Sequence, residues 1–295
     1  MNNFKKTIQK SKWLIKCMLL STEIERLICP NCGSGKSKNI DSKFIFTHLR
    51  ECENCYLRFR TPTDNVKDNY EYYQSEYSQE FTTDLPDREY LEKLLKSNFK
   101  NHEKSYFNII NLLKLFYPQK NKLFDFGCSW GYGSWQFQEA GFLVSSYEIS
   151  KSRSDFAAKN LGINMIDISN KLNENTIDIF FSNHVLEHVP SPSKTIALAK
   201  KMLKPDGIFV AITPNGSDSY RLNDYTAWHS LWGQNHPNHL SDTFYKQEFK
   251  DNPFFSSSIP DNLSDVIQWN QKKNQTLLSS YSSELLLLSY PNVKV

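Results

Sequence analysis

Short apolar runs and helical segments alternate over most of this chain. From Asp87 onward, apolar runs bounded by turn residues are separated by segments in which apolar residues recur every three to four positions. The runs predict buried strands and the segments predict helices. This alternation is typical of an α/β domain with a mostly parallel sheet. The predicted strands cover residues 122–126, 142–147, 163–168, 177–181, 208–212 and 284–288.

The helical periodicity predicts four helices in the same region, at residues 87–117, 133–140, 151–160 and 193–203. Pro118 ends the first of them, and Lys204-Pro-Asp-Gly207 predicts a stop and a turn after the last. Residues 214–283 are rich in Trp, His, Asn, Ser and Pro and exceed an ordinary loop in length. We expect them to form an insertion that carries function.

A short apolar segment, residues 13–20, lies near the N-terminus and is interrupted by lysine. It is too short to span a membrane. Glu23 and Glu25 follow it, where a signal peptide would have a small-residue cleavage site. We therefore interpret the segment as an amphipathic helix and expect a cytoplasmic protein without a membrane span.

The positive charge is concentrated at the N-terminal end. The net charge is +3, yet residues 1–60 hold 12 Lys/Arg and 5 Asp/Glu, whereas the remainder holds 23 and 27. A basic region on a mildly acidic domain can contact nucleic acid or another anion. A solvated basic surface is the simpler interpretation.

Four of the six cysteines form two Cys-x-x-Cys pairs, Cys29-Pro-Asn-Cys32 and Cys52-Glu-Asn-Cys55. Two such turns can present four thiolates to one tetrahedral ion, so the spacing predicts a structural zinc site in a β-rich ribbon. A disulfide pair or an iron–sulfur cluster is the alternative. Cys17 and Cys128 lie outside the pattern and are expected to be free thiols.

These segments suggest three parts of the chain. Residues 1–62 would hold the N-terminal helix and the zinc ribbon. Residues 63–118 would form a tyrosine-rich connector, with tyrosines at 70, 72, 73 and 77, followed by a helical cap. Residues 119–295 would form the α/β domain, including the insertion at 214–283.

A glycine-rich turn follows the first predicted strand of the α/β domain. Asp125 ends that strand, glycines occupy positions 127, 131 and 133, and Glu148 ends the next strand. Glycine lets a backbone approach a ligand closely, and a carboxylate at the second strand end can bind ribose hydroxyls. The spacing fits neither the dinucleotide fingerprint nor a P-loop. Asp125 would repel a phosphate and suits a cationic ligand.

These residues resemble the cofactor site of class I S-adenosylmethionine-dependent methyltransferases. The resemblance rests on Asp125-Phe-Gly127-Cys-Ser-Trp-Gly131, on Glu148, on Asn183-His184-Val-Leu-Glu187-His188, and on the segment from Leu203 to Asn215. It covers roughly residues 100–215. It implies a doubly wound, mostly parallel seven-stranded sheet. The family usually has Gly where this chain has Ser129.

The resemblance also implies roles for individual residues. The turn containing Gly127, Cys128, Ser129 and Gly131 would approach the methionine part of the cofactor, with Asp125 near its cationic end. Glu148 would accept the ribose hydroxyls. Asp167 and Ile168 would bracket the adenine, and Asn183 and His184 would line the reactive end.

Histidines are the candidate catalytic residues. If the acceptor is a hydroxyl, a general base helps methyl transfer, and His is the usual base. We expect His236 or His239 to serve, with His188 as a further candidate, and Tyr70 to Tyr77, Trp228 and Trp232 to form the acceptor pocket. The cluster of His229, His236 and His239 could instead bind a metal or pack against indoles.

The combined pattern predicts a methyltransferase that acts on a small polar acceptor. The order of zinc ribbon, tyrosine connector and methyltransferase domain is similar to enzymes of bacterial sugar, nucleotide-sugar and surface-polysaccharide pathways. This resemblance implies a small-molecule or glycan acceptor, with oxygen slightly favoured over carbon or nitrogen. An RNA methyltransferase and a non-catalytic cofactor-binding protein are the alternatives.

Overall fold

A large mixed sheet forms the centre of the molecule in a computed structural model, which describes residues 2–76, 84–116, 121–169, 173–258, 263–269, 275–277 and 282–294. The strand order is β11-β10-β12-β8-β7-β4-β5-β6, and β12 runs antiparallel to both of its neighbours. The other pairs are parallel, which confirms the predicted α/β class. The strands are β4 (Lys122–Phe126), β5 (Leu143–Tyr147), β6 (Asn164–Met165), β7 (Ile177–Asn183), β8 (Leu203–Pro214), β10 (Phe254–Ser258), β11 (Gln275–Leu277) and β12 (Glu284–Ser289).

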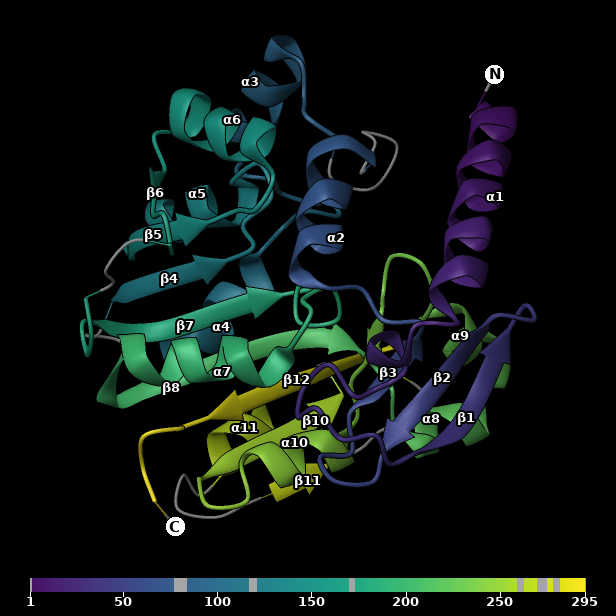
Figure 1. The fold of residues 1–295 in the computed structure, drawn as a ribbon. Helices are drawn as coiled ribbons and strands as arrows, with labels where there is room; N and C mark the ends of the chain where they lie inside the picture. The colour runs from purple at the N-terminus through teal and green to yellow at the C-terminus, as the bar shows by residue number, and fades with distance from the viewer. Residues whose placement is uncertain are drawn as a thin grey trace.

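Helices cover both faces of this sheet because the buried strands are apolar on both sides. In β7, Phe180 faces the cluster that contains α7, whereas Ile179 and Phe181 face the cluster that contains α4 and α5. Figure 1 shows α7 in front of β7 and β8, and α4 behind them. The helices of this domain are α3 (Arg88–Lys96), α4 (Phe107–Phe116), α5 (Tyr132–Glu139), α6 (Lys151–Leu161), α7 (Pro192–Met202), α10 (Asp242–Glu248) and α11 (Ser264–Gln268).

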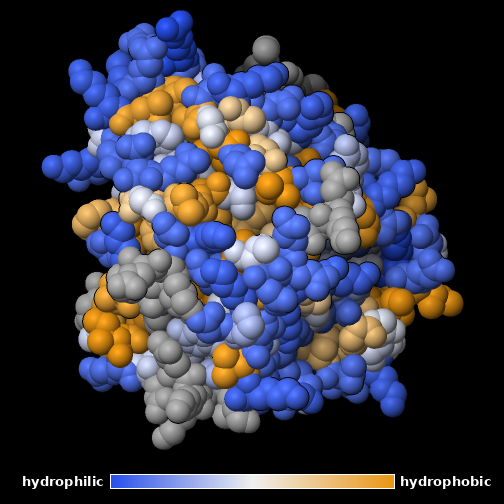
Figure 2. Space-filling view, turned by 90° about the vertical axis from the view of Figure 1, so that its left-hand side faces the viewer, coloured by the Kyte–Doolittle hydropathy of each residue, from blue (hydrophilic) through white to orange (hydrophobic). Residues whose placement is uncertain are grey.

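The edge of the sheet at which the parallel strands begin is mainly polar. Figure 2 views the molecule from that side, where hydrophilic residues predominate and apolar residues lie scattered among them. The carboxyl ends of the parallel strands lie at the opposite edge (Figure 1). Open α/β sheets bind their ligands at that second edge.

Three predictions about elements of the sheet were wrong. The helix predicted at 87–117 is two helices, α3 and α4, because Asn98, Phe99 and Asn101 have positive φ angles that a helix does not allow. Lys204 to Gly207 do not form a turn between helix and strand, since β8 begins at Leu203 and passes through them with a register shift against β7. The strand predicted at 163–168 is only the two-residue β6.

The segment predicted as an insertion contributes strands to the sheet. β10 and β11 both come from residues 214–283, and β10 pairs with β12. The seventh strand of the expected sheet is therefore β10, and β11 adds an eighth at the edge. The composition of β10 hid this strand, because three of its five residues are serine and only Phe254 and Phe255 are apolar.

A second, smaller sheet has the order β1-β2-β3-β9. The first three strands form an antiparallel meander, β1 (Ser37–Lys43), β2 (Thr47–Cys52) and β3 (Arg58–Thr61). The fourth, β9 (Asn238–His239), comes from much later in the chain and pairs with β3 through Arg58 and Phe59. Two helices, α8 (Asp218–Asn223) and α9 (Tyr225–Ser230), pack against this sheet in a cluster of Leu49, Tyr220, Trp228 and Trp232.

The N-terminal helix α1 (Asn2–Leu20) projects from the smaller sheet (Figure 1). Its inner side holds the buried Cys17 and Trp13, whose ring lies 5.3 Å from the Arg60 guanidinium. No helix in the described part of the chain combines the length and the apolar character that a membrane crossing requires. A short 3-10 turn, η1 (Ile24–Arg26), follows α1, and α2 (Val66–Glu71) with the π-helical η2 (Tyr72–Glu76) connects the smaller sheet to the rest.

Candidate active site

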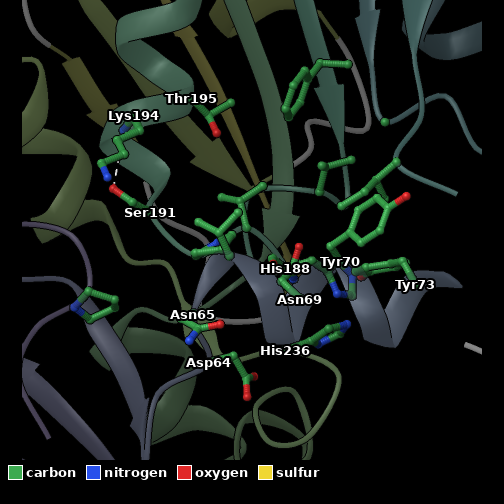
Figure 3. Close-up of a pocket in the computed structure, with 18 of the residues that line it drawn as sticks. Asp64, Asn65, Asn69, Tyr70, Tyr73, His188, Ser191, Lys194, Thr195 and His236 are labelled. Carbon is green, nitrogen blue, oxygen red and sulfur yellow. Dashed lines mark hydrogen bonds between the residues drawn. The ribbon is translucent and has the colours of Figure 1, made fainter. Parts of the chain in front are cut away.

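A cavity of about 1080 Å³ lies at the carboxyl ends of the parallel strands. Its walls come from the turn after β4, the end of β5, the turn after β7, and the connector that contains α2 and η2. Asn235 and His236 close it from the segment before β9. In Figure 3, His188, Tyr70, Tyr73 and His236 lie together at one end, and Ser191, Lys194 and Thr195 lie at another.

The glycine-rich turn after β4 forms one wall of the cavity. Gly127 has a φ of +86°, and a Cβ atom there would lie 2.3 Å from Cγ2 of Val185. Glycine is therefore required for the close approach of the two turns. Cys128 and Ser129 also line the cavity. Gly131 does not: its missing Cβ would meet Ala157 on α6, so this glycine lets the turn pack against that helix.

Glu148 lies at the end of β5 and faces the same wall. Its Oε2 accepts a hydrogen bond from the Ser129 amide at 2.9 Å, and its Oε1 accepts one from the Ser150 amide at 2.8 Å. Burial raises the pKa of this carboxyl group above its ordinary value. Each oxygen still has acceptor capacity, so the carboxylate can take two hydroxyl donors from a ligand. Two carboxylate acceptors side by side fit the two hydroxyl groups of a ribose.

Two acidic residues expected near the cofactor do not line the cavity. Asp125 is buried beneath the turn, where its Oδ2 accepts a hydrogen bond from Ser134 Oγ at 2.6 Å. Burial raises its pKa to about 7. Asp167 is exposed, and its Oδ1 accepts hydrogen bonds from Ser169, whereas the neighbouring Ile168 does line the cavity.

Asn183 and His184 reach the cavity from the end of β7. Asn183 Nδ2 donates to the Tyr106 hydroxyl at 3.0 Å. His184 Nε2 lies 2.6 Å from Glu284 Oε1, and its Nδ1 lies 3.3 Å from Glu187 Oε1. Burial alone would lower the pKa of His184, but the two carboxylates outweigh it and raise the pKa to about 10. This imidazole is therefore positively charged at neutral pH.

His188 and His236 form a pair at the end of the cavity next to Tyr70 and Tyr73, with ring centroids 4.7 Å apart. His188 Nδ1 lies 2.6 Å from the Asn235 carbonyl, and His236 Nδ1 lies 2.8 Å from the Leu231 carbonyl. Burial, reinforced by the neighbouring His236, lowers the pKa of His188 to about 4. His188 is consequently a weak proton acceptor near neutral pH.

His239, the other candidate base, lies away from the cavity. It is 1% exposed and packs against the Trp228 ring at 4.8 Å between centroids. His229 pairs with Asp41 instead, at 2.6 Å. The three imidazoles from the predicted cluster are thus separated, because β9 turns His239 into the smaller sheet while His236 remains at the cavity.

The predicted aromatic pocket is formed only in part. Tyr70 and Tyr73 line the cavity, but Trp228 and Trp232 are buried under the smaller sheet. Tyr77 lies outside the described residues. Tyr106, Asn69 and Asn235 line the cavity as well, and no motif pointed to them. The polar run Gln234-Asn-His-Pro-Asn-His239 was the one signal that could have suggested Asn235.

The four paired cysteines come together beside the smaller sheet. Their Sγ atoms all lie within 4.8 Å of one another, with Cys29 and Cys55 3.6 Å apart and Cys32 and Cys52 3.5 Å apart. Four thiols on two short turns are the donor set of a closed tetrahedral site. Asn31 connects this cluster to α7, since its Oδ1 accepts a hydrogen bond from the Ser193 amide at 2.9 Å.

A glycine turn, a ribose-compatible carboxylate and a cavity at the carboxyl ends of parallel strands are therefore present together. A family model described as "Methyltransferase domain" matches residues 79–254, which is more than half of the chain. The chain belongs to this methyltransferase family.

Relatives of this methyltransferase are distant. A ubiquinone biosynthesis O-methyltransferase of Actinobacillus pleuropneumoniae serotype 5b (strain L20) is 28% identical over 130 residues, 37% of this chain and 55% of that protein. The chain thus spans about half the length of this curated relative.

Solved structures of methyltransferases are similar at lower identity. The plantazolicin methyltransferase BpumL in complex with a monoazolic desmethylPZN analog and SAH is 14% identical, with coverage of 75% of this chain and 94% of that chain and a TM-score of 0.49. A TehB-like SAM-dependent methyltransferase from Corynebacterium glutamicum is 15% identical, with coverage of 68% and 95% and a TM-score of 0.43.

Proposed function

We propose that this protein transfers a methyl group from S-adenosylmethionine to a small polar acceptor. The observation that carries the proposal is the position of Glu148 and the Gly127 turn in one wall of a cavity that continues to the pair of His188 and His236. One end of the cavity then suits a nucleoside, and the other leaves room for a second reactant. Bound S-adenosylmethionine would supply an activated methyl group on a sulfonium ion.

The cofactor would be held by the turn and the two strand ends next to it. In this proposal Glu148 accepts the ribose hydroxyls, and Ile168 packs against the adenine. Gly127, Cys128 and Ser129 approach the amino-acid part, and Asn183 and His184 lie near the reactive end. Asp125 contributes from beneath the turn through Ser134, because its carboxylate does not reach the cavity.

The acceptor would lie against the imidazole pair and the connector. Asn69, Tyr70, Tyr73 and Asn235 supply amide and hydroxyl groups there, which suit a hydroxyl-rich molecule. We therefore favour a sugar, a nucleotide sugar or a surface-glycan intermediate, methylated on oxygen. The O-methyltransferase activity named for the Actinobacillus relative supports oxygen as the acceptor atom.

We also propose that Cys29, Cys32, Cys52 and Cys55 bind a structural zinc ion. The cluster of four thiols at 3.5–3.6 Å between neighbours supports this assignment. Zinc would hold the smaller sheet, which in turn pairs with β9 close to His236. The ion would thus stabilise the acceptor end of the cavity without taking part in chemistry.

Calorimetry with S-adenosylhomocysteine, followed by transfer assays with labelled methyl groups, tests the proposal. We expect cofactor binding that is weakened roughly 30- to 100-fold in Glu148→Gln, and label in at least one member of a panel of sugars and nucleotide sugars. His236→Gln should reduce transfer while cofactor affinity stays within threefold. Absence of cofactor binding at high micromolar concentration would refute the proposal. Label in RNA, with a steep salt dependence, would favour the nucleic-acid alternative.

A further inference from the structure

Glu187 is a buried carboxylate without a hydrogen-bond donor among the described residues. It is 1% exposed, and neither Oε1 nor Oε2 receives a hydrogen bond with acceptable geometry. His184 Nδ1 is 3.3 Å away and His188 Nε2 is 3.8 Å away. The charged His184 imidazole balances part of this buried charge, but both carboxylate oxygens keep lone pairs that no well-aligned hydrogen bond uses, so they can take a further ligand.

The two imidazoles beside Glu187 expose free nitrogen lone pairs to the same point. Each ring donates its Nδ1–H to a backbone carbonyl, Asn235 for His188 and Leu231 for His236. The Nε2 atom of each ring is therefore unprotonated in the neutral form. Histidine ligands of metals characteristically have their other nitrogen held in this way, because the carbonyl fixes both the tautomer and the ring orientation.

We infer that Glu187, His188 and His236 bind a divalent metal ion in the wall of the cavity. Their ligand atoms lie within 4.8 Å of one another, and the two histidines line the cavity, so an ion can reach them from it. One carboxylate and two imidazoles suit zinc, manganese, cobalt or iron(II).

This site differs from the cysteine cluster in chemistry and in exposure. The cysteine site offers four thiolates and no open position, whereas Glu187, His188 and His236 leave positions of the ion open to the cavity. Those positions would accept oxygen atoms of the acceptor and lower the pKa of a coordinated hydroxyl group. This last role rests on the proposed function, but the metal site itself does not.

Manganese binding, measured by electron paramagnetic resonance on the full chain with its cysteine site occupied by zinc, tests the inference. Manganese prefers oxygen and nitrogen ligands to thiolates, so its signal reports this site alone. We expect one bound Mn²⁺ per chain in the natural protein. The affinity should fall at least ~100-fold in His236→Gln and in Glu187→Gln, because each removes a ligand. His229→Gln, which changes an imidazole outside the cavity, should bind as the natural protein does.

Two further measurements, cofactor binding and methyl transfer, separate a failure of the metal site from a failure of the proposed function. Calorimetry with S-adenosylhomocysteine on the same variants shows whether the cofactor end is intact. If His236→Gln binds manganese as tightly as the natural protein, or if the natural protein binds none at millimolar concentration, the inference is wrong. Manganese binding without methyl transfer to any acceptor would leave the metal site standing and would refute the proposed function instead.

Discussion

The two ends of the cavity are built in different ways. The proposed cofactor end comes mainly from one stretch, Gly127 to Glu148, to which Ile168 and the end of β7 are added. The proposed acceptor end combines the connector, the turn after β7 and the segment before β9, which lie far apart in the sequence. Asn69 Nδ2 donates to the His188 carbonyl across 119 positions, and Tyr72 donates to Asn235 across 163.

The proposed cofactor end therefore depends on contacts between residues close in the sequence, whereas the proposed acceptor end depends on contacts between distant segments. The cofactor end needs only a strand, a turn and a helix in their usual arrangement, so it can form as soon as these pack. The acceptor end needs the smaller sheet to be complete, because β9 pairs with β3 and begins two residues after His236. This pairing positions the segment that contains His236. We therefore expect damage to the smaller sheet to affect the acceptor end first.

Replacement of Cys52 by Ser gives the largest expected effect. Removing one thiolate from a structural zinc site costs most of the metal-binding energy, which is about 10 kcal/mol or more in small zinc domains. We expect methyl transfer to fall more than ~100-fold while S-adenosylhomocysteine affinity, measured by calorimetry, stays within about threefold. Cys17→Ser, at a buried cysteine outside the cluster, is the control. An equal loss of methyl transfer and of S-adenosylhomocysteine affinity would show that the two ends are not independent.

Glu148→Gln should give the opposite pattern. Hydrogen bonds to a charged group contribute about 1.5–3 kcal/mol each, so losing the charge should weaken S-adenosylhomocysteine binding roughly 30- to 100-fold. Calorimetry measures the affinity, and manganese binding at the other end should be unchanged. Asp167→Asn is the matched control, because this exposed carboxylate lies outside the cavity. A comparable loss in Asp167→Asn would contradict the assignment.

Asp125→Asn should change how the stability of the cofactor end depends on pH. Burial raises the pKa of Asp125 to about 7, above the ordinary value of 3.8, so the folded state binds this proton more tightly than the unfolded state does. That stabilisation is complete below pH 4 and is lost as the pH rises towards 7. Between pH 5 and 8 the natural protein should lose about 3 kcal/mol that the variant does not lose. Denaturant unfolding at both pH values measures it, and parallel curves for the two proteins would contradict it.

Asn238→Ala should give the smallest effect, confined to the acceptor end. Asn238 Nδ2 donates to the Val189 carbonyl at 2.6 Å and so connects β9 to the turn that carries Glu187 and His188. Loss of one buried hydrogen bond costs about 1–2 kcal/mol. We expect a raised KM for the acceptor and an unchanged cofactor affinity. Asn252→Ala removes a comparable buried amide far from the cavity, so a similar KM change in that variant would argue for general destabilisation.

Sequence patterns predicted the local parts of the molecule well. The strands β4, β5, β7 and β12, the Gly127 turn and the cysteine pairs each depend on residues close together in the chain. The predicted fold class is confirmed for the same reason. The roles of individual cofactor residues remain predictions, and the structure brings Glu148, Gly127 and Ile168 to the cavity but not Asp125, Gly131 or Asp167.

The acceptor end could not be predicted because long-range pairing determines it. Nothing in the local pattern shows that Asn238 and His239 will pair with β3, and this pairing buries His239 while it leaves His236 at the cavity. The two histidines are only three positions apart. β10 was missed for a related reason. Its serine-rich sequence is typical of a loop, and it forms a strand because it pairs antiparallel with β12, which lies later in the chain.

The pairing of β3 with β9 also has a consequence for synthesis on the ribosome. The first three strands of the smaller sheet emerge early, but the strand that covers the edge of β3 emerges about 180 residues later. Throughout that interval the edge presents unpaired amides and carbonyls, which can pair with a neighbouring nascent chain. Slower elongation before residue 238 should therefore increase aggregation, and early zinc loading should not prevent it.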